Sequence, residues 1–260
     1  MKIHPSTVIQ GELDAHESVE VGPYCLIQGK VKLGAGCIIE GHATLGCRHG
    51  ELEIGERNHF FPGSAIGGPP QDLSYKNQTT RLKIGNDNIF REFSTANMAT
   101  QKGDGVTSIG DHNYFMSYTH IGHDCKVGNH IVIANDTHVG GHVTIEDHVT
   151  IGGVCAFNQN TVIGKYSFIA GSSVVNKDIL PYSKAQGVFA VCRATNKVGL
   201  QRKGFAPEEI DNIHRAIRII LMGSDTMDEG IARIQEECMM TPALEYFVQF
   251  IRKSERGIAR

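Results

Sequence analysis

An aliphatic or aromatic residue recurs at every sixth position through most of the first two thirds of this chain. The longest unbroken run consists of Ile109, Phe115, Ile121, Val127, Ile133, Val139, Ile145, Ile151, Phe157, Ile163, Ile169 and Val175. A period of six fits neither an α-helix, which repeats every 3.6 residues, nor a strand, which alternates every two. The pattern therefore predicts short strands that turn after every sixth residue.

A glycine often follows the repeated apolar residue, as in Ile121-Gly122 and Ile163-Gly164. We expect this glycine to supply the corner, because glycine tolerates backbone conformations that other residues avoid. Three strands of six residues make a coil of eighteen, so residues eighteen apart should stack about 4.8 Å from one another. The predicted fold is mainly β, a parallel β-helix of about nine or ten coils and roughly 45 Å in length.

Two segments interrupt the repeat, residues 67–83 (GGPPQDLSYKNQTTRLK) and residues 98–107 (MATQKGDGVT). Both are rich in polar residues and glycine or proline, which is typical of loops. A stacked coil can accommodate extra residues only by ejecting them. We therefore expect two loops that project from the coil wall, where a binding site is readily built.

The six-residue pattern stops after Pro181, and helical spacing replaces it. Helices are expected over residues 206–221, 227–239 and 242–253, each with apolar residues on one face. We therefore divide the chain into a coil domain over residues 1–190 and a helical domain over residues 191–260. The helical domain would cap the open end of the coil.

Composition narrows the functional classes. The net charge of −3 and the pI of about 6.5 give no reason to expect nucleic acid or an anionic membrane surface as a partner. The chain has neither a signal-peptide pattern nor an apolar run long enough for a membrane segment, so we expect a soluble cytoplasmic protein. The seven cysteines contain no CxxC pair and are expected to be reduced core thiols.

Histidines crowd the unbroken part of the repeat, at positions 112, 120, 123, 130, 138, 142 and 148. Three interpretations are open. They could be polar residues of the outer wall, which is the common case. A zinc site from His120, His123, His138 and His142 is conceivable, although no carboxylate or thiol stands beside them in a familiar spacing. The third interpretation is acid–base catalysis.

Catalysis is favoured by the spacing of His123, Gly141 and Gln159, which lie eighteen residues apart and should stack. A glycine beside an imidazole leaves a slot in which a backbone N–H can be reached. Asp124 could orient the ring, so that His123 acts as a general base. A base and an oxyanion donor together are the minimum equipment for acyl transfer to a hydroxyl.

Four segments resemble motifs of the UDP-N-acetylglucosamine 3-O-acyltransferases, a hexapeptide-repeat family of left-handed parallel β-helices. They are PQDLSY at 70–75, HIGHDC at 120–125, GGH at 140–142 and NKVGLQRKGF at 196–205. The resemblance covers the whole chain. It implies transfer of an acyl or hydroxyacyl group from acyl carrier protein to a hydroxyl, or an amine, of a UDP-amino sugar, in the first step of lipid A synthesis or a variant of it. It implies a homotrimer with active sites between subunits, and neither a cofactor nor a metal.

The resemblance also implies roles for single residues. His123 would deprotonate the sugar hydroxyl, Asp124 would support it, and the Gly141 amide would stabilise the oxyanion. Substrate contacts are implied for Gln71, Asp72, Ser74, Asn97, His120, His142, Asn158, Gln159, Asn196 and Arg202. The acyl chain would occupy a pocket at Gly153, Phe168, Gly171 and Phe189. A positive patch for the acidic carrier protein could be formed by Lys184, Arg193, Lys197, Arg202 and Lys203.

Four of the matched positions depart from the usual family pattern. Ser74 replaces a lysine, Asn97 and Asn158 each replace a histidine, and Val198 replaces a glutamate. None is the proposed base, so we expect the chemistry to be retained and the recognition of acceptor or donor to be altered. Two alternatives stay open: a CoA-dependent sugar acetyltransferase, because the repeat alone does not identify the donor, and a catalytically inactive paralogue that acts as a scaffold.

The phenylalanines of the implied acyl pocket generate a first prediction. A bulky side chain at Phe168 or Phe189 would shorten the pocket, so we predict that the preferred acyl chain is not a long one. Initial rates with a series of acyl carrier donors of increasing chain length measure this preference. A maximum at the myristoyl length or above would contradict the prediction.

Overall fold

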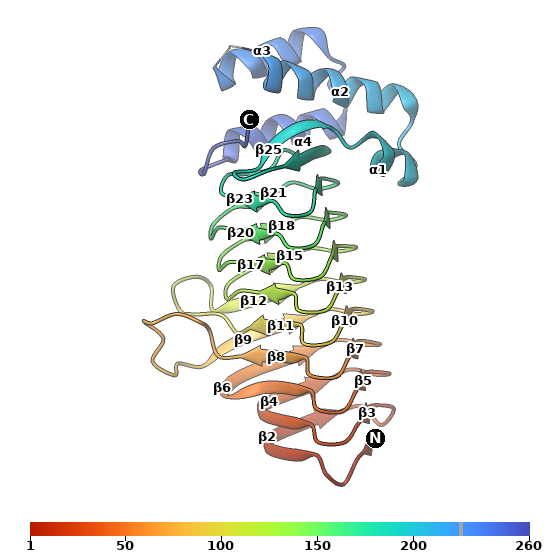
Figure 1. The fold of residues 1–260 in the computed structure, drawn as a ribbon, viewed down its shortest axis with the longest axis vertical. Coiled ribbons are helices and arrows are strands. Elements are labelled where there is room, and N and C mark those ends of the chain that lie inside the picture. Colours follow the sequence, from red (N-terminus) through yellow and green to blue (C-terminus); the bar gives the residue numbers. More distant parts are fainter. Residues whose placement is uncertain (224–225) are drawn as a thin grey trace.

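Short parallel strands stack along the molecule and form a β-solenoid of about ten turns, with helices at its C-terminal end (Figure 1). The computed structural model describes residues 1–223 and 226–260. The expected fold, a parallel β-helix followed by a helical region, is confirmed.

Three walls make up the solenoid. The first wall contains β1 (Lys2–Ile3), β3 (Glu20–Val21), β5 (Ile38–Ile39), β7 (His59–Phe60), β10 (Ile89–Phe90), β13 (Tyr114–Phe115), β16 (Val132–Ile133), β19 (Thr150–Ile151), β22 (Phe168–Ile169) and β24 (Ser183–Gln186), with β25 (Val191–Thr195) antiparallel to β24. The second wall contains β8 (Ala65–Gly68), β11 (Thr95–Asn97), β14 (His120–Ile121), β17 (His138–Val139), β20 (Ala156–Phe157) and β23 (Val174–Val175).

The third wall contains β9 (Thr80–Ile84), β12 (Val106–Ile109), β15 (Lys126–Val127), β18 (Thr144–Ile145) and β21 (Val162–Ile163). Near the N-terminus, three long strands run from the second wall into the third: β2 (Val8–Ala15), β4 (Leu26–Leu33) and β6 (Thr44–Ile54). The first half of β6 pairs with β8, and its second half pairs with β9.

The repeated apolar side chains fill the inside of the solenoid. Each of the twelve residues in the unbroken run from Ile109 to Val175 is at most 4% exposed. Residues eighteen apart pair directly, as His120 does with His138, so the predicted stacking is confirmed. The core is one continuous column because every turn adds three apolar residues to the same interior.

The glycine after each apolar residue has a different role from the predicted one. Gly122 does not have a positive φ, and a Cβ atom on it would lie 2.8 Å from the backbone of Gly140 and Gly141 in the next coil. The left-handed residue comes two positions later, at Asp124 (φ 61°) and His142 (φ 59°). Glycine is therefore needed for the close approach of coils, and residues other than glycine occupy most of the left-handed corners, including Phe93 and Val154.

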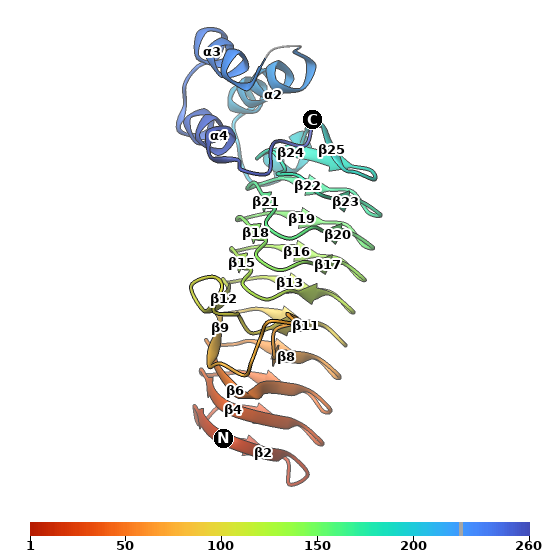
Figure 2. The same ribbon diagram turned by 90° about the vertical axis from the view of Figure 1, so that its left-hand side faces the viewer.

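Four helices follow: α1 (Lys197–Arg202), α2 (Pro207–Met222), α3 (Met227–Glu237) and α4 (Pro242–Lys253). The last three match the predicted segments, whereas α1 is too short to show a helical period in the sequence. Both views place the helices beyond the last coils (Figures 1 and 2). The domain boundary at residue 190 stays a prediction, and β24 and β25 pair across it.

Both predicted loops leave the wall on the same side of the molecule (Figure 1).

All seven cysteines are buried free thiols, as expected. Within the described ranges, no helix combines the length and the apolar character that a membrane crossing requires.

The interior column predicts a large loss of stability when one of its side chains is shortened. Leu82 in β9 is fully buried, so Leu82→Ala should lower the free energy of unfolding by about 2–5 kcal/mol. Leu73, in the loop, is fully exposed, and Leu73→Ala should change it by less than about 0.5 kcal/mol. Urea unfolding of both variants measures the difference, and equal effects would contradict a core that is filled by the repeat.

Candidate functional site

His123 lies at the end of the second wall, where the chain turns toward the third. It follows β14, and the corner itself is formed by Asp124. In the next coil Gly141 lies directly against the imidazole, and a Cβ atom there would be 2.6 Å from the His123 Cε1. Only glycine leaves room for the ring, so the predicted neighbourhood of His123 and the Gly141 main chain is present.

Asp124 holds the His123 ring in one orientation. The His123 Nδ1 lies 2.8 Å from the Asp124 Oδ2, and the carboxylate is buried. Because an ionised carboxylate only accepts hydrogen bonds, Nδ1 carries the proton and Nε2 presents a lone pair. An imidazole in this tautomer can act as a general base.

Thr100 supports Asp124 from the loop at 98–107. Its Oγ1 donates to the Asp124 Oδ2 at 2.8 Å, and its backbone N–H donates to both carboxylate oxygens at 3.1 Å. The Asp124 backbone N–H donates in turn to the Thr107 Oγ1 at 2.8 Å. Nothing in the sequence singled out Thr100, because its role depends on where the ejected loop folds back.

His142 is a second imidazole beside the same carboxylate. Its Nε2 lies 3.5 Å from the Asp124 Oδ2, and its ring meets the His123 ring edge to face, with centroids 5.2 Å apart. One ligand atom from each of His123, Asp124 and His142 lies within 4.8 Å of the others, so this trio has the spacing of a metal site. The carboxylate already accepts bonds from Thr100 and His123, which favours a hydrogen-bonding role. The zinc set that the sequence suggested is a different one.

His120 faces outward from β14 and is partly buried. Its Nδ1 lies 2.7 Å from the Thr95 Oγ1. Burial lowers the pKa of His120 to about 4, with smaller contributions from the neighbouring His138 and His123. His120 is therefore neutral near pH 7 and can donate or accept one hydrogen bond without adding charge to the site.

Several other predicted residues lie at the same corner. Gln159 lies one coil after Gly141. The backbones of these two coils touch, because a Cβ atom placed on Gly140 would be only 3.1 Å from the Gln159 backbone N. Asn158 precedes it. The remaining residues belong to the loops or their bases: Gln71, Asp72, Ser74 and Asn97. The Asn97 Nδ2 donates to the Pro69 carbonyl at 2.9 Å, which joins the two loops.

A second group of predicted residues lies at a different corner. Phe168, Asn196, Val198 and Arg202 line a hollow of about 250 Å³ between the first wall and α1, together with His148, Thr150, Tyr166, Lys184, Gly199 and Lys203. Asn196 caps α1, and its Nδ2 donates to the Tyr166 carbonyl at 3.0 Å. The sequence did not indicate the stack of His112, His130, His148 and Tyr166 rings that builds this corner.

The implied acyl-pocket residues are also separated from His123 within one chain. Gly153 and Gly171 lie one coil apart at the corner between the first and second walls, where a Cβ of Gly171 would be 3.2 Å from the Gly153 carbonyl. Phe189 follows the bridge between Val174 and Val188 and is 62% exposed. One chain therefore divides the predicted site residues among its three corners.

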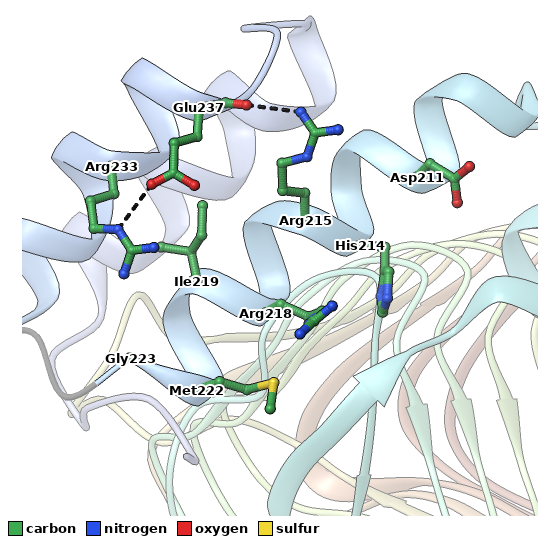
Figure 3. A pocket seen from close by; sticks show the side chains of 9 residues that line it. All are labelled: Asp211, His214, Arg215, Arg218, Ile219, Met222, Gly223, Arg233 and Glu237. Carbon is green, nitrogen blue, oxygen red and sulfur yellow. Dashed lines mark hydrogen bonds and ion pairs between the residues drawn. The ribbon is translucent and has the colours of Figure 1, made fainter.

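A larger hollow of about 540 Å³ lies in the helical region, between α2 and α3 (Figure 3). It is lined by Asp211, His214, Arg215, Arg218, Ile219, Met222, Gly223, Arg233 and Glu237. Arg233 pairs with the Glu237 carboxylate, and Arg215 donates to the Glu237 carbonyl. None of the predicted catalytic residues is among the residues that line it, so it is separate from the His123 site.

Two family models match the chain. Residues 178–259 match the second domain of UDP N-acetylglucosamine O-acyltransferase, and residues 107–141 match the bacterial transferase hexapeptide repeat. The acyl-(acyl-carrier-protein)–UDP-N-acetylglucosamine O-acyltransferase of Thermodesulfovibrio yellowstonii is 39% identical over 100% of this chain and 99% of its own length. The enzyme of the same name from Myxococcus xanthus is 40% identical, with the same coverage.

Solved structures agree. LpxA from Acinetobacter baumannii superposes with a TM-score of 0.95 at 36% identity, and the match covers 99% of both chains. The UDP-N-acetylglucosamine acyltransferase of Francisella novicida gives a TM-score of 0.94 at 35% identity, covering 99% of this chain and 94% of that one. The similarity therefore extends over both the coil and the helices.

The low pKa of His120 predicts part of the acid sensitivity of this protein. The unfolded chain binds a proton at His120 below about pH 6.5 and the folded chain only near pH 4, so stability should fall as pH drops through that window. His120→Gln should reduce this fall, whereas His49→Gln, a change at an exposed histidine in the N-terminal part of the solenoid, should leave it as in the wild type. Urea unfolding at both ends of the window measures it, and identical pH dependence in the wild type and His120→Gln would refute it.

Proposed function

This chain belongs to the family of acyl-carrier-protein-dependent UDP-N-acetylglucosamine O-acyltransferases, and we propose that His123 is the general base of its reaction. That reaction transfers an acyl group from acyl carrier protein to a hydroxyl of UDP-N-acetylglucosamine, the first step of lipid A biosynthesis. The single observation that carries the proposal is the orientation of the His123 ring, with Nδ1 on Asp124 and Nε2 available.

The proposed step balances as follows. The His123 Nε2 takes the proton of the sugar hydroxyl while that oxygen attacks the thioester carbonyl carbon. The oxyanion that forms lies at the Gly141 amide, which supplies a hydrogen bond where charge develops. The C–S bond then breaks, and the proton on His123 passes to the thiolate of the carrier. Asp124 stabilises the intermediate imidazolium and keeps its tautomer.

We also propose that the working unit is a homotrimer with active sites between subunits. The division of the predicted residues among three corners supports this, because a neighbouring chain can bring its hollow at Asn196 and Arg202, or its corner at Gly171, toward His123. Exposed aromatic side chains on the corner between the first and second walls also favour an interface, namely Tyr24, Phe93 and Tyr118. In a closed symmetric ring, every subunit uses both of its contact surfaces, so no interface stays exposed.

The two alternatives are less well supported. A CoA-dependent acetyltransferase does not account for the match of residues 178–259 to the second domain of the sugar-nucleotide enzyme. An inactive scaffold does not account for the intact contact among His123, Asp124 and Gly141. The substitutions at Ser74, Asn97, Asn158 and Val198 lie outside this contact, so we infer that they adjust substrate recognition.

Replacing the base tests the catalytic proposal. His123→Ala should lower kcat/KM by about 100- to 10,000-fold, the usual contribution of a positioned general base. His16→Ala, which changes an exposed histidine near the N-terminal end of the solenoid, should keep the wild-type rate. Mass spectrometry of the acylated UDP-sugar follows both. Unchanged activity of His123→Ala would remove this histidine from the mechanism.

Subunit mixing tests the trimer. If a site takes His123 from one subunit and Arg202 from its neighbour, each mixed ring of inactive His123→Ala and Arg202→Ala chains has one intact site out of three. Random assembly of equal amounts makes about three quarters of the rings mixed, so the preparation should recover about a quarter of the wild-type activity. Two affinity tags verify that the chains have exchanged. Mixed trimers without any activity would contradict a site shared between subunits.

A further inference from the structure

The two ejected loops are joined at their bases by main-chain and side-chain hydrogen bonds. The Met98 backbone N–H donates to the Gly68 carbonyl at 2.8 Å, and the Asn97 Nδ2 donates to the Pro69 carbonyl at 2.9 Å. These contacts start both loops from the same corner of the second wall. They do not fix the outer ends of the loops, which need contacts of their own.

Lys102 joins the tips. Its Nζ lies 2.6 Å from the Asp72 Oδ2, across thirty residues of sequence. The other carboxylate oxygen, Oδ1, accepts hydrogen bonds from the Ser74 backbone N–H and hydroxyl, each at 2.7 Å. The Lys102 hydrogen bond is the main reason that the pKa of Asp72 lies far below its usual range, so Asp72 stays ionised.

The loop that carries Lys102 also contacts the proposed catalytic pair. The Lys102 backbone N–H donates to the Thr100 Oγ1 at 3.1 Å, and that hydroxyl donates to Asp124. A Cβ atom on Gly103 would lie 3.2 Å from the Asp124 Oδ1. Lys102 therefore connects Asp72 to Asp124 through a short chain of hydrogen bonds.

We propose that Lys102 is a positioning residue for the binding of the acceptor. Its ammonium holds Asp72 in place over the site and supplies the positive charge that position 74 lacks. The proposal rests on the proposed function and deepens it. The family resemblance implies a lysine at position 74, where this chain has Ser74, and here the cation that meets Asp72 comes from the other loop. The Lys102 side chain is 56% exposed, so its remaining N–H groups are open to a polar group of the sugar nucleotide.

This role predicts a defect in binding and not in chemistry. Without Lys102, the loop that carries Asp72 and Ser74 loses its tie to the other loop and can move away from the acceptor. Asp124 keeps its hydrogen bonds from Thr100 and His123. Interactions made equally with substrate and transition state change KM and leave kcat unaltered. The KM for the UDP-sugar should therefore rise while kcat and the KM for the acyl carrier stay the same.

Lys126 offers a matched control. It is a second lysine that holds the loop at 98–107, through bonds of 2.7 and 2.9 Å to the Asp104 carboxylate and of 2.6 Å to the Val106 carbonyl. It belongs to β15 on the third wall, and its ion pair is with Asp104 and not with Asp72. A general loosening of the loop should affect Lys126→Gln as much as Lys102→Gln, whereas a specific role of Lys102 should not.

The experiment is steady-state kinetics of the full-length protein with UDP-N-acetylglucosamine and a hydroxyacyl carrier protein. Lys102→Gln should raise the KM for the UDP-sugar by about fivefold at the wild-type kcat, and Lys102→Arg should restore it. The double variant Ser74→Lys with Lys102→Gln should also recover, because the new lysine can reach Asp72 from within its own loop. Lys126→Gln should keep the wild-type KM.

Four results would overturn the proposal. They are a wild-type KM in Lys102→Gln, an equal rise in Lys126→Gln, a rise confined to the carrier KM, and a double variant as impaired as Lys102→Gln alone. Circular dichroism of each variant confirms that it is folded. Failure of the proposed function is distinct from these outcomes, because it would appear as absence of acyl transfer by the wild-type protein.

Discussion

Main-chain hydrogen bonds between consecutive coils are the interaction on which the rest of this structure depends. They run in parallel register, for example from the Gly122 N–H to the Val139 carbonyl and from the Gly140 N–H to the Phe157 carbonyl. This register fixes which residues stack, so His123 lies against the Gly141 main chain by construction. The proposed general base and the proposed oxyanion donor therefore need no flexible element to bring them together.

In the proposed mechanism the solenoid carries the chemical step and the loops carry substrate recognition. His123, Asp124 and Gly141 belong to successive turns of a rigid wall, where a shift of one residue would reverse which side chains face the core. The loops at 67–83 and 98–107 are outside that constraint and can change in sequence without disturbing the coil. Three of the four departures from the family pattern lie away from the turns that hold His123 and Gly141. Ser74 lies in one loop, Asn97 lies at the base of the other, and Val198 lies in α1.

Asp124 couples the two parts. Its carboxylate accepts from the His123 ring on the wall and from Thr100 in the loop, and Thr100 in turn accepts from the Lys102 backbone. The Lys102 ammonium meets the Asp72 carboxylate in the same network, and in our proposal it supplies the charge that the family resemblance implies at position 74.

The six-residue period by itself determined the parallel coil, the column of apolar side chains and the stacking of His123 on Gly141, because these follow from local spacing and from a register that repeats. Only the tertiary structure decided the rest. It assigned the close approach of coils to Gly122 and the left-handed corner to Asp124, and it added α1, which is too short to produce a period. It also brought Thr100 and Lys102 to Asp124 and Asp72, since the path of an ejected loop depends on contacts between residues distant in the sequence, which no periodicity records.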